Sequence, residues 1–167
     1  MQIARRNRAS TPLNPLDVVE EIITTNEWTF ERTGPEELIV EVAGRWCDYN
    51  MFFSWSRETH ALQFCAACEL RIPTPRRAAV RDLVMLINDK MWLGHFCITP
   101  DDTMLTFRHA VLLRGTPGVA NEQVEDLLDV ALSECDRYYP AYQFVMWGAR
   151  TPIDALAAAL IDPVAEA

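Results

Sequence analysis

A Cys-Ala-Ala-Cys segment at residues 65–68 has the spacing from which proteins build redox disulfides and half of a zinc site. A redox pair of this kind normally begins a helix, where the helix dipole lowers the pKa of the thiol. Here the segment lies in a run of alternating apolar residues that predicts a strand, and residues three apart on a strand point to opposite faces. Cys65 and Cys68 are therefore poorly placed to share a zinc ion or a disulfide. We expect core packing and a half-exposed thiol instead.

Two histidines and a cysteine form the other cluster that could bind a metal. If a turn pairs Thr99 with Thr103, then His95, Cys97 and His109 share one face of a hairpin, with the two histidines as diagonal neighbours. No carboxylate with suitable spacing completes a ligand set. The pattern therefore favours half-buried structural histidines, and we predict no metal site and no cofactor.

No sequence motif for catalysis is present. The chain lacks a GxSxG elbow, a Walker loop and a GxGxxG turn. The acidic pair Asp101-Asp102 lies in a predicted turn, and Glu36-Glu37 lies at a predicted strand edge. Neither pair has the apolar surroundings that would raise the pKa of a carboxylic acid for general acid–base work. We predict no catalytic residues and a protein that is not an enzyme.

The composition describes one acidic domain. The chain has 167 residues and a mass of 19.0 kDa, half of its residues are hydrophobic, and 24 acidic residues outweigh 15 basic ones to give a net charge of −9. Such a charge repels phosphate backbones, so we expect no nucleic-acid binding. No apolar run approaches the roughly 20 residues that span a bilayer, so we expect no membrane insertion. Five cysteines without a secretion signal favour reduced thiols in the cytoplasm.

The N-terminal residues 1–14 differ in charge from the rest. They carry Arg5, Arg6 and Arg8 and no acidic residue. No apolar segment follows the arginines, so we do not expect a signal peptide. Two interpretations stay open, a flexible basic tail lying near its acidic domain or a basic arm that contacts a partner.

The order of apolar patterns predicts an α+β fold. A helix, a meander of antiparallel strands, a helix, a hairpin and further helices follow one another, giving an antiparallel sheet of five to six strands with flanking helices. The expected helices begin near residues 15, 75, 121 and 152, and the expected strands cover residues 28–32, 38–42, 46–56, 62–70, 93–99 and 104–113.

Capping residues and prolines mark the helix boundaries. Asn14 and Pro15 begin the first helix by a polar cap and a proline at the first helical position, and Thr74-Pro75 begins the second in the same way. Pro140 is expected to kink or end the third helix, which otherwise spans about residues 121–138.

Three large side chains lie on the polar face of the predicted meander. In the alternating strand, Trp46 and Phe52 point away from the apolar face, and Ile39 does so on the preceding strand. Large apolar residues on such a face indicate that it is partly covered. The cover is a helix of the same chain, a second subunit or a partner segment. We predict Trp46, Phe52 and Ile39 as partner-binding residues.

Three stretches carry a family resemblance. They are Leu86-Ile87-Asn88-Asp89 with Gly94-His95-Phe96, Asp101-Asp102-Thr103-Met104-Leu105-Thr106-Phe107-Arg108, and Asp136-Arg137-Tyr138-Tyr139-Pro140-Ala141-Tyr142-Gln143 with Trp147-Gly148 and the Thr151-Pro152-Ile153-Asp154-Ala155-Leu156 helix. Taken in order over about residues 15–160, they resemble the bacterial YbjN-domain family of sensory transduction regulators. The resemblance implies a fold like class I type III secretion chaperones, commonly dimeric, and a non-enzymatic regulatory role. It also implies that Asn88 caps or bridges the end of the second helix.

These observations give a domain plan and two functional hypotheses. We expect a flexible basic tail at 1–14, a YbjN-like α+β domain at 15–148 and a C-terminal Ala-rich helix and tail at 149–167. The first hypothesis is a homodimeric, chaperone-like regulator that binds an extended or amphipathic segment of a partner protein of unknown identity. The alternative is a small-ligand sensor with a pocket between sheet and helices lined by Tyr49, Met51 and Trp55.

Overall fold

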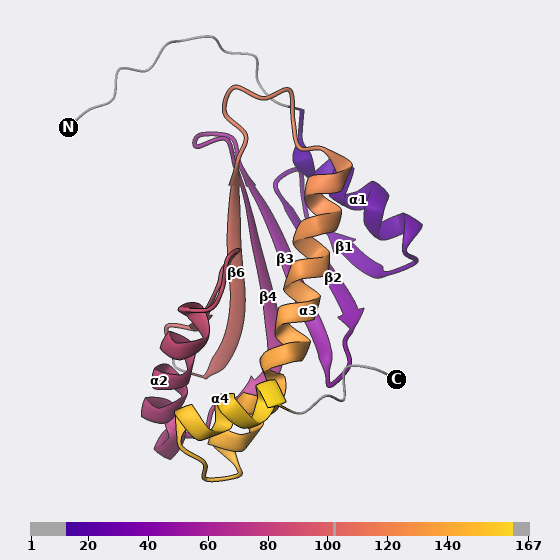
Figure 1. Cartoon of the computed structure of the whole chain (residues 1–167). Coiled ribbons are helices and arrows are strands. Elements are labelled where there is room, and N and C mark those ends of the chain that lie inside the picture. Colours follow the sequence, from indigo (N-terminus) through magenta and orange to yellow (C-terminus); the bar gives the residue numbers. More distant parts are fainter. Residues whose placement is uncertain (1–12, 102, 162–167) are drawn as a thin grey trace, which may run out of the picture.

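A computed structural model describes residues 13–101 and 103–161 of the chain (Figure 1). The helices are α1 (Pro15–Thr25), α2 (Arg77–Asn88), α3 (Asn121–Met146) and α4 (Pro152–Ile161), and a short 3-10 helix, η1 (Thr74–Arg76), precedes α2. The strands are β1 (Thr29–Arg32), β2 (Glu37–Ala43), β3 (Asp48–Ser56), β4 (Ala61–Arg71), β5 (His95–Ile98) and β6 (Met104–Leu112). The predicted α+β class, with an antiparallel sheet of five to six strands, is confirmed, and the described residues contain six strands. Most of the predicted basic tail lies outside the described residues.

The six strands form one antiparallel sheet in the order β1-β2-β3-β4-β6-β5. Helix α3 crosses one face of this sheet, α1 packs beside it, and α2 and α4 close the lower end (Figure 1). Alternate residues of β3 point to this helix-covered face, and Tyr49, Met51, Phe53 and Trp55 are buried there as predicted. The opposite face, which we call the open face, carries the intervening residues of each strand.

Helix α1 begins where its capping residues predict. The Leu16 amide donates to the Asn14 side-chain oxygen at 3.0 Å, and Pro15 occupies the first turn. Arg32 of β1 then ties the sheet to this helix through the carboxylates of Asp17 at 2.8 Å and Glu20 at 2.6 Å. The apolar side of α1 is therefore held at a fixed position in the core, beside α3.

Helix α3 does not end at Pro140. It continues to Met146, because residues on both sides of the proline, including Tyr138, Tyr139 and Tyr142, are buried against the core. Proline has no amide hydrogen, so the carbonyl of Asp136, four residues earlier, has no helical donor. That carbonyl has a different partner, which contributes to the candidate site below.

The hairpin of β5 and β6 is shifted by one residue from the predicted register. His95 lies opposite Arg108, and not opposite Phe107 as predicted. His109 pairs with Phe64 of β4, whose buried side chain belongs to the helix-covered face, whereas His95 lies on the open face. The prediction that His95, Cys97 and His109 share one face was therefore wrong for His109.

None of the helices in the described part of the chain has the length and apolar character needed to span a bilayer.

Candidate functional site

The three predicted partner-binding residues lie on two different sides of the sheet. Ile39 and Phe52 are cross-strand neighbours on the open face. Trp46 precedes β3 in the bend of residues 44–47 and contacts α3, on the helix-covered side. The placement of Trp46 on the same face as Phe52 was therefore wrong, because the alternation of β3 begins only at Asp48. The binding role of the three residues stays a prediction.

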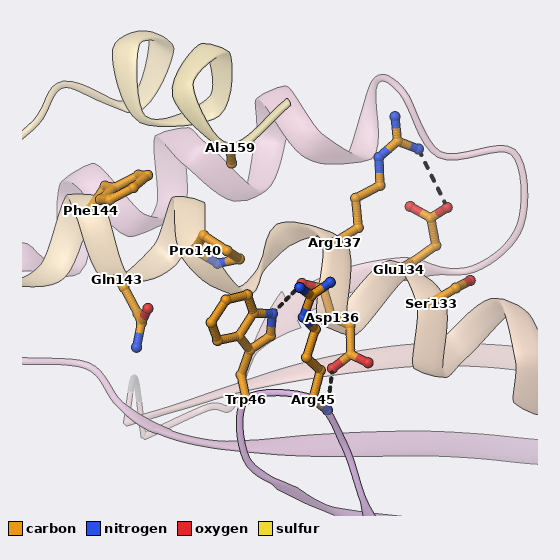
Figure 2. A pocket seen from close by; sticks show the side chains of 10 residues that line it. All are labelled: Arg45, Trp46, Ser133, Glu134, Asp136, Arg137, Pro140, Gln143, Phe144 and Ala159. Carbon is orange, nitrogen blue, oxygen red and sulfur yellow. Dashed lines mark hydrogen bonds and ion pairs between the residues drawn. The ribbon is translucent and has the colours of Figure 1, made fainter. Parts of the chain in front are cut away.

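Trp46 forms one wall of a groove of about 570 Å³ between the β2–β3 bend, α3 and α4 (Figure 2). The groove combines apolar, amide, hydroxyl and charged side chains of both signs. Its lining residues are Arg45, Trp46, Ser133, Glu134, Asp136, Arg137, Pro140, Gln143, Phe144 and Ala159. This mixture of an aromatic wall with a few polar groups is typical of sites that bind an amphipathic ligand.

Three contacts fix the indole of Trp46. Its Nε1 donates to the Asp136 carbonyl at 3.0 Å, the carbonyl that Pro140 leaves without a helical donor. Its ring stacks on Tyr139 with 4° between the planes and 6.2 Å between centroids. The Arg45 guanidinium lies over the indole, 5.1 Å from its centroid. Trp46 is nevertheless 43% exposed, so it is held in place and still available for contact.

The carboxylate of Asp136 joins the bend to the core. Its Oδ1 accepts from the Arg45 amide at 3.1 Å and from the Tyr49 hydroxyl at 2.7 Å. Burial of Tyr49, together with the hydrogen bond to Asp136 and its negative charge, raises the pKa of the phenol far above its usual value. Tyr49 therefore stays a hydrogen-bond donor, and the wall of the groove is anchored to the sheet.

One acceptor in the groove has no partner in the part of the chain that the structure describes. Arg137 Nη1 approaches Glu134 Oε1 at 3.8 Å, a long contact for an ion pair (Figure 2). The Arg137 guanidinium also lies 5.4 Å from the ring centre of Tyr138. The other oxygen, Glu134 Oε2, is buried and accepts no hydrogen bond from the described residues. A buried unpaired carboxylate oxygen is unfavourable, so a bound donor at this position would stabilise it.

The cysteines have the character of packing residues. Cys65 is half-buried on the open face and Cys68 is buried on the helix-covered face, as the strand geometry predicts. Burial raises the pKa of Cys65, and contact with Cys68, together with burial, raises the pKa of Cys135. Thiols shifted in this direction are poor nucleophiles at neutral pH. Among the described residues, no group of three or more metal-ligating side chains is arranged to hold an ion.

The pocket expected between Tyr49, Met51 and Trp55 is filled. Their exposed fractions are 0, 0 and 4%, and they pack inside the core cluster. None of the three lines the groove around Trp46. The location predicted for a sensor pocket was therefore wrong, because the apolar face of β3 is covered by the chain's own helices.

The family model for YbjN, described as "Putative bacterial sensory transduction regulator", matches residues 15–144. The chain belongs to the YbjN family. The matched region runs from α1 into α3 and stops before α4, so Ala159 is the groove residue that lies outside it. Asn88, expected from the family resemblance to cap or bridge the end of α2, bridges α2 to β5. Its amide group donates to the Phe96 carbonyl at 2.9 Å and accepts from the Phe96 amide at 2.7 Å.

A solved structure from E. coli, titled "Crystal structure of YbjN, a putative transcription regulator from E. coli", is similar to this chain. The TM-score is 0.51 at 13% identity, and the alignment covers 80% of this chain and 89% of that one. At this identity the likeness shows the fold. No curated protein matches the sequence. The family description fits a general regulatory role, and the groove of about 570 Å³ is the concave surface that Trp46 lines.

Sequence reasoning identified Trp46 but not the groove. The residues that hold the indole lie about 90 positions away along the chain, on α3. One local signal was present, because a proline inside a predicted helix leaves a carbonyl four residues earlier without its donor. That signal points to Asp136, but not to the side chain that binds it.

Proposed function

We propose that this YbjN-family protein is a non-enzymatic, cytoplasmic regulator that acts as a homodimer and binds a segment of a partner protein in the groove around Trp46. The observation that carries the proposal is the exposed but rigidly held indole at the wall of that groove. Aromatic anchors of this kind supply most of the binding energy in protein interfaces, and holding one in place before binding reduces the entropy lost on association.

The chemistry of the groove favours an amphipathic segment. Pro140, Phe144 and Ala159 offer apolar contact beside the indole, whereas Arg137 and Glu134 offer charges of opposite sign (Figure 2). A segment with an apolar side chain between charged residues complements this arrangement. The net charge of −9 adds a long-range preference for basic partners.

The test compares Trp46→Ser with Trp147→Ser. Both tryptophans are exposed, but Trp147 does not line the groove. Proteins captured from the native host by the wild-type chain are identified, purified and titrated against each variant. We expect Trp46→Ser to weaken binding at least tenfold and Trp147→Ser to change it less than twofold. Equal affinity of the wild-type chain and Trp46→Ser would refute the proposal.

A second candidate function is a small-ligand sensor that uses the same groove. Glu134 Oε2, which is buried and has no hydrogen-bond partner among the described residues, favours it, since this atom could accept a hydrogen bond from a ligand. A thermal-shift screen separates the two functions. A compound that raises the melting temperature of the wild-type chain but not that of Glu134→Ala supports the sensor. A screen without such a compound, combined with a captured protein that needs Trp46, supports the partner-binding function.

A further inference from the structure

The open face carries a row of side chains with opposite charges at its two ends. The strand register aligns one residue from each strand across the sheet, in the order Glu31, Ile39, Phe52, Cys65, Arg108 and His95 from β1 to β5. The row therefore begins with an acidic residue, has three apolar or weakly polar residues at its centre and ends with two residues that can carry a positive charge, Arg108 and His95. Phe52 is 42% exposed at the centre.

Two further acids lie on either side of Ile39 along β2. Glu37 and Glu41 point to the same open face, two residues before and after Ile39, and both are exposed. The β1–β2 side of the face is thus acidic, whereas Arg108 is exposed on β6 at the other side. A face divided in this way complements a rotated copy of itself.

We propose that the open face is the interface of a homodimer in which the two sheets pack face to face, related by a two-fold axis parallel to the strands. Rotation about such an axis between β3 and β4 places β1 over the second copy's β5, β2 over its β6 and β3 over its β4. Arg108 of each copy then meets Glu37 and Glu41 of the other, and Phe52 meets Cys65. This inference rests on the dimeric state in the proposed function and assigns a surface to it.

The charge pattern selects this axis over the other one that sheet packing allows. An axis in the interface but perpendicular to the strands would place β2 over β2 and β6 over β6, so that the acidic residues Glu37 and Glu41 of one copy would face those of the other. Like charges in direct apposition are unfavourable. Strands related by the parallel axis stay within about 30° of each other, the usual angle between packed sheets.

The area of the face is sufficient for a stable contact. Six strands at a spacing of about 4.8 Å span about 24 Å, and a nine-residue strand such as β3 is about 30 Å long. The resulting face of about 700 Å² is close to the roughly 800 Å² that each partner buries in a standard interface.

The net charge of each copy does not prevent this contact. Each copy has a net charge of −9, but at physiological salt the interaction between charges more than about 8 Å apart is screened. The ion pairs formed directly across the interface therefore dominate the electrostatic energy.

Charge reversal on each side of the face tests the proposal. The full-length wild-type chain is studied by sedimentation equilibrium in 0.15 M NaCl, where we expect twice the chain mass of 19.0 kDa at micromolar concentration. Arg108→Glu, and separately Glu37→Arg with Glu41→Arg, are each expected to raise the dissociation constant of the dimer at least 100-fold. An equimolar mixture of the two variants is expected to form a mixed dimer with an affinity within tenfold of the wild type, because every facing pair is again opposite in charge.

Lys90→Glu is the matched control, since Lys90 is exposed just after α2 and away from the open face. It is expected to leave the dissociation constant within twofold of the wild type. Circular dichroism and urea unfolding confirm that each variant is folded, and Phe52→Glu provides a second disruption that does not depend on charge pairing.

Three outcomes would overturn the proposal. They are a wild-type chain that stays monomeric up to about 100 μM, a dimer that persists in both Arg108→Glu and Phe52→Glu, and a mixture of the reversed variants that stays monomeric. Binding of the open face to a captured partner by a monomeric chain would assign the face to that partner instead. Trp46→Ser is expected to stay dimeric, so failure at the open face is distinguishable from failure of the groove.

Discussion

At the scale of single residues, Asn88 holds the start of β5 through two hydrogen bonds to one residue, the amide and the carbonyl of Phe96. Asn88→Ala removes both and leaves two backbone groups beside the core without partners. We expect the free energy of unfolding to fall by about 2 kcal/mol, measured by urea unfolding. Asp89→Ala, at the exposed neighbouring position, is expected to change it by less than about 0.5 kcal/mol. Equal effects of the two variants would contradict the bridging role.

Gly94, which immediately precedes β5, is a second single-residue constraint. Its φ of +67° lies in the left-handed region, and a Cβ added there would be 2.3 Å from Cζ of the buried Phe107 ring. Gly115 also has a positive φ, +86°, but a Cβ added there meets nothing within 4 Å. We expect Gly115→Ala to cost about 1 kcal/mol from the backbone alone, and Gly94→Ala about 3 kcal/mol because the Phe107 ring is displaced as well. Thermal or urea unfolding of the two variants measures the difference, and similar losses would exclude the steric contribution.

At the scale of elements, Pro140 and Trp46 act as a pair. The proline removes the helical donor of the Asp136 carbonyl, and the indole Nε1 replaces it. In Pro140→Ala the alanine amide competes for that carbonyl, so the indole hydrogen bond contributes less to the free energy of unfolding. A double-mutant cycle of Pro140→Ala with Trp46→Phe is therefore expected to give a coupling free energy of about 1 kcal/mol by urea unfolding.

The control cycle pairs Pro140→Ala with Trp147→Phe. Trp147 is exposed and donates its backbone amide, not its indole, to α3. Its effect and that of Pro140→Ala are expected to add within about 0.5 kcal/mol. A coupling free energy near zero for Trp46 would show that the helix bend, and not the freed carbonyl, determines where the indole lies.

The elements themselves were largely predictable from local patterns. The cap at Asn14 and the alternation from Tyr49 to Trp55 follow from side-chain chemistry within a few residues, and both are confirmed. The register of β5 on β6 was not predictable in the same way. The Asp101 carboxylate accepts hydrogen bonds from the Thr99 and Thr103 side chains, and the Thr99 amide pairs with the Met104 carbonyl, which shifts the hairpin by one residue.

The placement of Trp46 failed for a related reason. A two-residue alternation counted back through the bend assigns Trp46 to the face of Phe52, but the Gly44 amide donates to the Cys47 carbonyl at 3.0 Å and closes a turn before the strand begins. The groove needed even longer-range information, because Trp46 meets an α3 carbonyl about 90 residues away. Sequence patterns therefore predicted which large side chains were candidates for contact, and tertiary packing decided which surface each one serves.

At the scale of the whole molecule, the tyrosines make stability sensitive to high pH. All four tyrosines have a pKa above the usual value, chiefly because burial disfavours the phenolate; for Tyr138, Tyr139 and Tyr142 burial is likewise the largest cause. In the unfolded chain these phenols titrate near pH 10. Between that pH and the higher native values, the unfolded state has lost protons that the native state keeps. The contribution of the tyrosines to the free energy of unfolding is therefore fully present below about pH 9 and is lost as the pH rises further.

The expected slope is up to about 1.4 kcal/mol per pH unit for each phenol that stays protonated in the native state. Urea unfolding between pH 7 and 10.5, in the presence of a reductant, measures this loss, and absorbance at 295 nm reports phenolate formation directly. The phenolate signal is expected to rise together with unfolding and not before it. Tyr139→Phe removes one titrating group and is expected to reduce the slope by the contribution of one proton, up to about 1.4 kcal/mol per pH unit. A phenolate signal near pH 10 in folded protein would contradict the prediction, because it would show that the phenols are accessible to solvent and not buried between the helices and the sheet.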